Sequence, residues 1–150
     1  MTEVPPGQFL QGLCPSLALS ELPFLSPPPL FDVRTAEEYT QGHIPGALNQ
    51  PLFDHFERST IGTLYKQVSP ESAIAAGLRY VEPRVQQLVE SFRPWQQQPL
   101  IVYCARGGMR SASVVRLLNS EGFNAQQLRG GYKYYRQQVL QALEQWSPSL

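Results

Sequence analysis

The segment PLIVYC, residues 99–104, constrains the fold more than any other part of the chain. It is a continuous apolar run of strand length with β-branched residues, which is typical of a strand buried on both faces. Such strands belong to parallel sheets whose crossover helices cover each face. We therefore predict a central sheet strand over these residues.

Strand-like and helix-like segments alternate around this run. Short strands are predicted at Leu30–Val33, Ala47–Asn49 and residues 123–128. Helical patterns with capping signals or amphipathic spacing lie between and after them, over residues 35–41, 69–77, 81–95, 111–122 and 132–146. The alternation predicts an α/β fold, a mostly parallel central sheet with helices on both faces.

The chain length fits one domain, which we place at residues 30–146. A proline-rich lead-in, residues 1–29, is expected to be mostly loop because proline is excluded from helix interiors and central strands. Residues 147–150 are interpreted as a tail. Two helices are expected to end at glycines, Gly77 and Gly122.

The two ends of the chain differ in charge although the whole is neutral. Residues 1–50 carry one arginine and five acidic residues, net −4, whereas residues 101–150 carry six basic and two acidic residues, net +4. The neutral total excludes a strongly basic nucleic-acid binder. The basic surplus at the C-terminal end favours an anionic ligand there.

Cysteine spacing and hydropathy exclude several other classes. Cys14 and Cys104 lie ninety positions apart without a CxxC pair or a Cys/His cluster, so neither a disulfide framework nor a metal site is predicted. No stretch approaches the roughly 20 apolar residues of a membrane span. We expect a cytoplasmic protein with no cofactor and no membrane partner.

The main candidate site follows the predicted central strand. Cys104 ends that strand, and the next residues combine small, basic and polar side chains: Ala105, Arg106, Gly107, Gly108, Met109, Arg110 and Ser111. Backbone N–H groups of a glycine-rich loop converge on an anion, and a helix N-terminus and arginines favour a thiolate. We predict Cys104 as the nucleophile and the residues after it as an anion-binding loop. The structural alternative is an inert buried cysteine.

Two further groups of residues are assigned to the neighbourhood of this site. Asp32, Arg34 and His43 are expected to be structural, tying a strand end to the turn GHIPGA, residues 42–47. The segment RGGYKYYR, residues 129–136, ends the last strand and opens a helix. It holds side chains that stack on bases and contact phosphates beside two glycines, and these candidate tRNA or rim residues are Gly130, Gly131, Tyr132, Lys133 and Arg136. A solvated helix face is the alternative for this segment.

These motifs resemble a known family. FDVRTAEEYTQGHIPGALN, followed by a cysteine loop at a strand end, resembles the rhodanese family of sulfurtransferases. More narrowly, IGTLYKQVSPESAIAAGL, YCARGGMRS and LRGGYKYYR resemble the rhodanese domain of tRNA 2-selenouridine synthases, with the likeness covering about residues 30 to 137. The resemblance implies that Cys104 carries sulfur or selenium as a persulfide or perselenide. It also implies a small donor, selenophosphate or thiosulfate, and tRNA 2-thiouridine as the acceptor.

The resemblance also implies a partner. Synthases of this type carry a second domain with a Walker A motif, and no GxxxxGK[ST] pattern occurs in residues 1–150. A separate P-loop domain or chain is therefore the expected partner.

Three alternative functions stay open. Cys104 and Arg110 have the C-x5-R spacing of cysteine phosphatases, but Tyr103 replaces the usual histidine and no aspartate follows the loop as a general acid. A generic rhodanese sulfurtransferase that uses thiosulfate or a persulfide donor is the second alternative. A rhodanese-like binding module without catalysis is the third.

Overall fold

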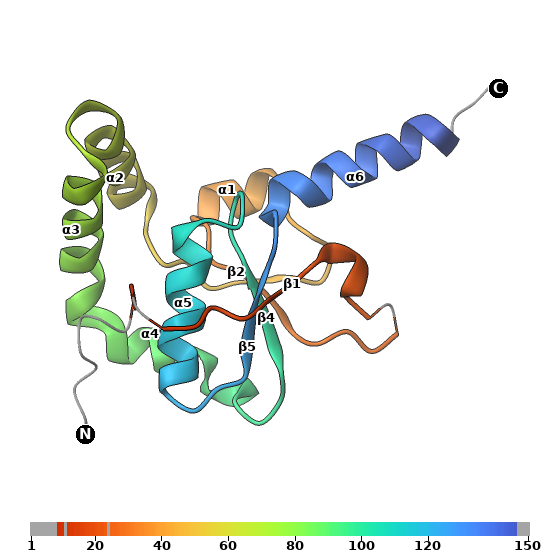
Figure 1. The fold of residues 1–150 in the computed structure, drawn as a ribbon, viewed down its shortest axis with the longest axis horizontal. Coiled ribbons are helices and arrows are strands. Elements are labelled where there is room, and N and C mark those ends of the chain that lie inside the picture. The colour runs from red at the N-terminus through yellow and green to blue at the C-terminus, as the bar shows by residue number, and fades with distance from the viewer. Residues whose placement is uncertain (1–8, 11, 24, 147–150) are drawn as a thin grey trace.

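The computed structural model describes residues 9–10, 12–23 and 25–146 and contains a five-stranded sheet. The strands are β1 (Ser16–Leu17), β2 (Leu30–Asp32), β3 (Leu48–Asn49), β4 (Leu100–Tyr103) and β5 (Ala125–Leu128), in the order β1-β5-β4-β2-β3 (Figure 1). All four neighbouring pairs are parallel. The carboxyl ends of the strands therefore meet at one edge, where ligands bind in open α/β sheets.

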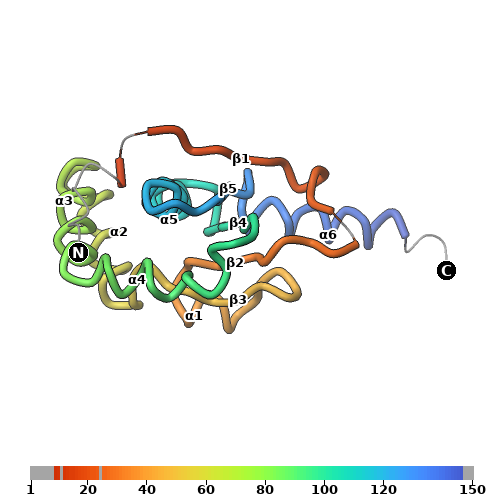
Figure 2. Tube along the Cα trace, turned by 90° about the horizontal axis from the view of Figure 1, so that it is seen from below, coloured from red at the N-terminus to blue at the C-terminus, as the bar shows by residue number. Residues whose placement is uncertain are grey.

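Helices cover both faces of this sheet. They are α1 (Ala36–Gln41), α2 (His55–Gln67), α3 (Pro70–Val81), α4 (Val85–Phe92), α5 (Met109–Ser120) and α6 (Gly131–Trp146), with short 3-10 helices at Leu19–Glu21, Glu82–Arg84 and Arg93–Trp95. Figure 2 shows α4 and α5 on one side of the strands and α6 on the other. The predicted α/β class with a parallel sheet is confirmed.

Strand β4 divides the core into two layers. Leu100 and Val102 belong to the hydrophobic cluster that includes α4 and α5, whereas Ile101 and Tyr103 belong to the cluster that includes Leu128 and the first residues of α6. Successive side chains of a strand point to opposite faces, so a fully apolar strand serves both layers. This confirms the interpretation of PLIVYC as a central strand.

The lead-in contributes more structure than its proline content predicts. Ser16 and Leu17 pair with Gln127 and Leu128 of β5 and form an edge strand, where proline nearby is tolerated. Residues 1–8 of the predicted lead-in and the predicted tail, 147–150, lie outside the described residues.

Helix boundaries differ from the predictions at three points. Helix α3 continues past Gly77 to Val81, so the predicted helix end at Gly77 is wrong; its backbone does not adopt the positive φ of a glycine that ends a helix. The single helix predicted at 81–95 is divided into two 3-10 turns and α4, because Pro83 and Pro94 each remove a backbone donor. Helix α5 begins at Met109 rather than Ser111.

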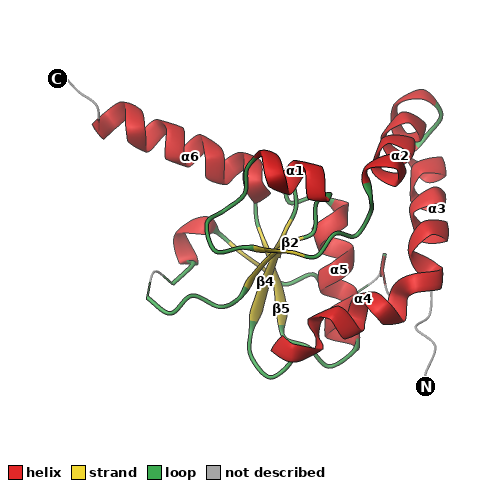
Figure 3. Ribbon diagram, turned by 180° about the vertical axis from the view of Figure 1, so that it is seen from behind, coloured by secondary structure: helices red, strands yellow, loops and turns green. Residues whose placement is uncertain are grey.

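The remaining helices extend to opposite ends of the molecule. The α2–α3 pair lies on one side, and the C-terminal half of α6 projects from the other (Figure 3). Among the described residues, no helix is long and apolar enough to cross a membrane.

Candidate active site

The cysteine loop, residues 104–110, lies at the carboxyl edge of the sheet between β4 and α5. Tyr103 anchors its start: the side chain is fully buried, and its hydroxyl accepts a hydrogen bond from the Ile44 backbone N–H at 3.1 Å. Burial raises the pKa of Tyr103, so the phenol stays neutral and structural. Cys104 itself is only 3% exposed.

The first turn of α6 holds the cysteine loop from the other side. The N–H groups of Tyr132 and Lys133 donate to the carbonyls of Cys104 and Ala105 at 2.9 and 2.8 Å. Gly131 has a φ of +56°, and a Cβ there would collide with the Cys104 carbonyl oxygen. Glycine is required here both for the backbone conformation and for the close approach.

The backbone N–H groups that follow Cys104 are unpaired among the described residues. From Ala105 to Ser111, no backbone N–H donates to an acceptor within the part of the chain that the structure describes. Those of Met109, Arg110 and Ser111 also form the N-terminus of α5, which carries partial positive charge. Unpaired backbone N–H groups at a helix N-terminus are suited to an anion, and the anion-binding role of the loop stays a prediction.

Ser111 and Gln127 fix the surroundings of the cysteine sulfur. The Ser111 Oγ lies 3.0 Å from the Cys104 Sγ, and Gln127 Nε2 donates to that oxygen at 2.8 Å and to the Gly108 carbonyl at 3.0 Å. Because Gln127 occupies a lone pair of Ser111, the hydroxyl proton is free to point at the sulfur. Cys14 extends this series of contacts, since its Sγ lies 3.6 Å from Gln127 Oε1.

Arg110 is bound by a carboxylate instead of facing the loop without a partner. Its two terminal nitrogens donate to the two oxygens of Glu38 at 2.8 and 3.2 Å. Glu38 also closes the predicted capping box with Thr35 at the start of α1. Burial opposes the ionisation of Glu38, but the hydrogen bonds and charge of Arg110 prevail and lower the pKa of Glu38 to about 2.

Asp32, Arg34 and His43 hold the neighbouring turn. The Arg34 guanidinium binds Asp32 at 2.7 Å and donates to the Gly42 carbonyl at 2.7 Å. The His43 Nδ1 lies 2.9 Å from the Tyr39 carbonyl oxygen, and its ring stacks on Tyr39. None of these contacts involves the cysteine loop.

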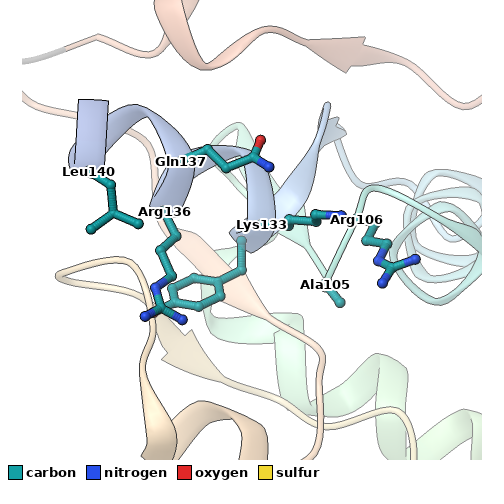
Figure 4. A pocket seen from close by; sticks show the side chains of 7 residues that line it. Ala105, Arg106, Lys133, Arg136, Gln137 and Leu140 are labelled. Atoms are coloured by element: carbon teal, nitrogen blue, oxygen red, sulfur yellow. The ribbon is translucent and has the colours of Figure 1, made fainter. Parts of the chain in front are cut away.

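A hollow of about 400 Å³ adjoins the cysteine loop beside α6. We call it the cationic hollow, and its lining consists of Ala105, Arg106, Tyr132, Lys133, Arg136, Gln137 and Leu140. Figure 4 shows Arg106 of the loop across from Arg136 of α6, with Lys133 between them. Within the described residues these three cations form no ion pair.

Tyr132 packs against other elements of the fold. Its ring packs under the Arg34 guanidinium at 4.4 Å and closes on Gly42, where a Cβ would collide with the phenol. The side chain therefore joins α6 to the turn after α1, although it also borders the hollow. Arg129 of the same segment pairs with Glu21, so Lys133 and Arg136 are its cations without an ion-pair partner among the described residues.

Two contacts of the site were not predicted from the sequence: that of Gln127 with Ser111 and that of Glu38 with Arg110. Gln127 stands in the short strand AQQL, where a buried amide among apolar residues is a usable signal, since buried polar groups need partners. The position of Glu38 in the sequence is explained by its capping box with Thr35, so no pattern indicated its ion pair with Arg110.

Comparisons with known proteins agree with this geometry. The family model of the rhodanese-like domain matches residues 18–138. The chain is 36% identical over 140 residues to a tRNA 2-selenouridine synthase of Nitrosomonas europaea and 41% identical over 121 residues to one of Salmonella schwarzengrund. These alignments cover 89% and 79% of this chain but 36% and 34% of the relatives. The chain thus spans about a third of the length of these curated relatives.

Solved structures give the same picture. The N-terminal domain of an ATP/GTP binding protein from Clostridium difficile 630 is 39% identical, with a TM-score of 0.78, over 83% of this chain and 98% of that one. A human single domain sulfurtransferase is 28% identical, with a TM-score of 0.50, over 83% and 96%.

The Glu38–Arg110 pair predicts a pH dependence of stability. The lowered pKa of Glu38 contributes stability that is present above pH 4.5 and is lost as the pH falls toward 2. Glu38→Gln should lower the free energy of unfolding at pH 7 by on the order of 2 kcal/mol. The difference in the free energy of unfolding between Glu38→Gln and the original protein, measured by urea titration, should shrink as the pH falls from 4.5 to 2. Glu90→Gln, which removes an exposed carboxylate paired with Arg93, is the control; a deficit independent of pH contradicts the prediction.

The Gln127 contact predicts a change in the reactivity of Cys104. The Ser111 hydroxyl already lies 3.4 Å from the Gly108 carbonyl, which also accepts from Gln127 at 3.0 Å. Gln127→Leu removes this competing donor, so the hydroxyl should turn from the sulfur to the carbonyl, and the sulfur loses a donor. Alkylation of Cys104 by iodoacetamide at pH 7 should slow by roughly threefold to tenfold, which corresponds to one hydrogen bond. Gln126→Leu, on the opposite face of β5, should keep the original rate. Equal rates in both variants would remove Gln127 from the site.

Proposed function

The chain belongs to the rhodanese-like domain family, and from this premise we propose that it transfers sulfur or selenium through Cys104 in tRNA modification. One observation carries the proposal: the Cys104 sulfur lies at the base of a loop whose backbone N–H groups have no acceptor among the described residues. These donors stabilise a negative charge held on or next to the sulfur.

The chemistry is that of a thiolate attacking the outer atom of an oxyanion donor. With thiosulfate, a bond forms between the Cys104 sulfur and the outer sulfur, and the S–S bond of the donor breaks. The electron pair of that bond leaves with sulfite, and Cys104 becomes a persulfide anion. Selenosulfate reacts in the same way and leaves a perselenide. In this proposal, the loop N–H groups stabilise both the arriving dianion and the terminal chalcogen.

The phosphatase alternative loses support from the position of Arg110. A C-x5-R phosphatase needs this guanidinium for the phosphate oxygens, whereas here both terminal nitrogens bind Glu38. Tyr103, which replaces the usual histidine, is buried and bonded to Ile44. No aspartate follows the loop to protonate a leaving group. The seven-residue spacing remains suited to any tetrahedral oxyanion.

We propose tRNA as the acceptor and the cationic hollow as its contact. The relatives named above are tRNA 2-selenouridine synthases of about three times this length. Arg106, Lys133 and Arg136 have no ion-pair partner among the described residues and lie in or next to the cysteine loop, and cations placed in this way suit a phosphate backbone. A P-loop domain or chain is the second proposed partner, in keeping with the ATP/GTP binding neighbour.

Incubation with a donor tests the transfer step. Thiosulfate or selenosulfate should add the mass of one sulfur or one selenium atom to the intact protein, and Cys104→Ser should abolish the addition. Cys14→Ser is the matched control and should keep it, because Cys14 is outside the loop and burial raises its pKa. No Cys104-dependent adduct, together with fast aryl-phosphate hydrolysis, would favour the phosphatase alternative.

RNA binding tests the acceptor. Arg106, Lys133 and Arg136 should be replaced together by alanine, and binding of a labelled anticodon stem-loop measured by fluorescence anisotropy over a range of salt. The affinity should fall, and the slope of log K against log salt should decrease by roughly 0.7 to 0.9 for each phosphate that the variant no longer neutralises. The control, Lys66→Ala with Arg79→Ala on α2 and α3, should bind as the original protein does. Equal slopes in all three proteins would exclude the hollow as the RNA-binding surface.

A further inference from the structure

Arg110 has the position of an anion ligand but is held by a carboxylate. It closes the C-x5-R spacing that begins at Cys104, and it precedes Ser111, whose Oγ lies 3.0 Å from the cysteine sulfur. Its side chain is only 13% exposed, so it packs against the protein instead of extending into solvent. Both of its terminal nitrogens donate to Glu38. The loop therefore contains a guanidinium suited to an oxyanion, and that guanidinium is already occupied.

Glu38 is fixed by a second set of contacts that do not depend on Arg110. Its Oε1 accepts from the backbone N–H and from the hydroxyl of Thr35, both at 3.1 Å. The Thr35 Oγ1 in turn accepts from the backbone N–H of Glu38 at 3.2 Å. This capping box anchors the carboxylate to the start of α1, and its negative charge lies against the last residue of the cysteine loop.

A carboxylate in this place opposes the binding of an anion in two ways. It occupies guanidinium N–H groups that would otherwise donate to anion oxygens, and its charge repels the anion. The pair of Glu38 and Arg110 carries no net charge. Of the two arginines in the cysteine loop, only Arg106 has no ion-pair partner among the described residues.

We propose that Glu38 is a specificity-determining residue that withholds Arg110 from tetrahedral oxyanions at the cysteine loop. With Arg110 withheld, the backbone N–H groups bind the anion without the guanidinium, and inorganic phosphate is held weakly. When the carboxylate is removed, the guanidinium is free to donate to two oxygens of the anion. The inference rests on the anion-binding role of the loop in the proposed function, but not on the transfer of sulfur or selenium.

Protection of Cys104 by inorganic phosphate tests the proposal. Alkylation by iodoacetamide at pH 7 is followed over a range of phosphate concentrations at constant ionic strength. In Glu38→Gln, the phosphate concentration that halves the alkylation rate should fall about tenfold or more, as expected for at least one charge-assisted hydrogen bond. Glutamine also serves at the third helical position of a capping box, so the start of α1 is kept.

Two further variants assign the effect to Arg110. Glu38→Gln combined with Arg110→Ala should lose the gain, because the released guanidinium is gone. Glu57→Gln is the matched control, since Glu57 closes the capping box of α2 and accepts from both terminal nitrogens of Arg84. This arrangement repeats that of Glu38 on a different helix, and Glu57→Gln should need the same phosphate concentration as the original protein.

The outcomes separate this proposal from the transfer function. An equal or higher half-protecting phosphate concentration in Glu38→Gln would overturn the role of Glu38 and leave the transfer function standing. A gain that survives Arg110→Ala would also overturn it, because the loss of the Glu38 charge alone would explain the effect. A gain that depends on Arg110, in a protein that forms no persulfide with thiosulfate, would sustain the proposal and overturn the transfer function.

Unfolding of a variant cannot imitate the expected result. An unfolded chain exposes Cys104 to iodoacetamide at every phosphate concentration, so it loses protection, whereas the proposal predicts stronger protection in Glu38→Gln. A purely structural role of Glu38 likewise predicts a loss. Far-UV circular dichroism of each variant, recorded in the assay buffer, identifies any that is unfolded.

Discussion

The contact between the cysteine loop and the first turn of α6 is the constraint on which the site depends. Two backbone hydrogen bonds, from Tyr132 and Lys133 to Cys104 and Ala105, hold the loop carbonyls on the α6 side. From Ala105 to Ser111, the backbone N–H groups have no acceptor among the described residues. The contact requires Gly131, because any Cβ there meets the Cys104 carbonyl. The cysteine loop therefore depends on a glycine of a distant segment.

The arginines and lysines discussed above for the cysteine loop and its neighbouring turn fall into two groups with different roles. Arg34 and Arg110 are neutralised by Asp32 and Glu38, and each ties an element end to its neighbour. Arg106, Lys133 and Arg136 have no acidic partner among the described residues, so their charge is available to a ligand. Desolvated paired charges stabilise geometry, whereas unpaired charges at an edge attract anions. Charge balance along the chain does not reveal this division.

The sequence predicted the parts of the structure that local signals encode. The apolar run at β4 and the capping box at Thr35 each act over a few residues, and both predictions are confirmed. Edge strand β1 was missed because it is two residues long and owes its existence to β5, more than a hundred positions away. Gln127 and the Glu38–Arg110 pair were missed for the same reason. Their partners lie on other elements, and only the fold brings them together.

The depth of the cysteine limits which molecules reach it. With 3% of Cys104 exposed and Ser111 against its sulfur, the sulfur is too deep for direct contact with a group as large as a nucleoside. A chalcogen bound to that sulfur extends the reactive end by about 2 Å, the length of the new bond. The carried atom, rather than the cysteine, is then the group that an RNA positioned in the cationic hollow would meet. Under the proposed function, the buried Cys104 and the open basic hollow beside it would serve the two halves of the transfer, since a small donor and a large acceptor need different access.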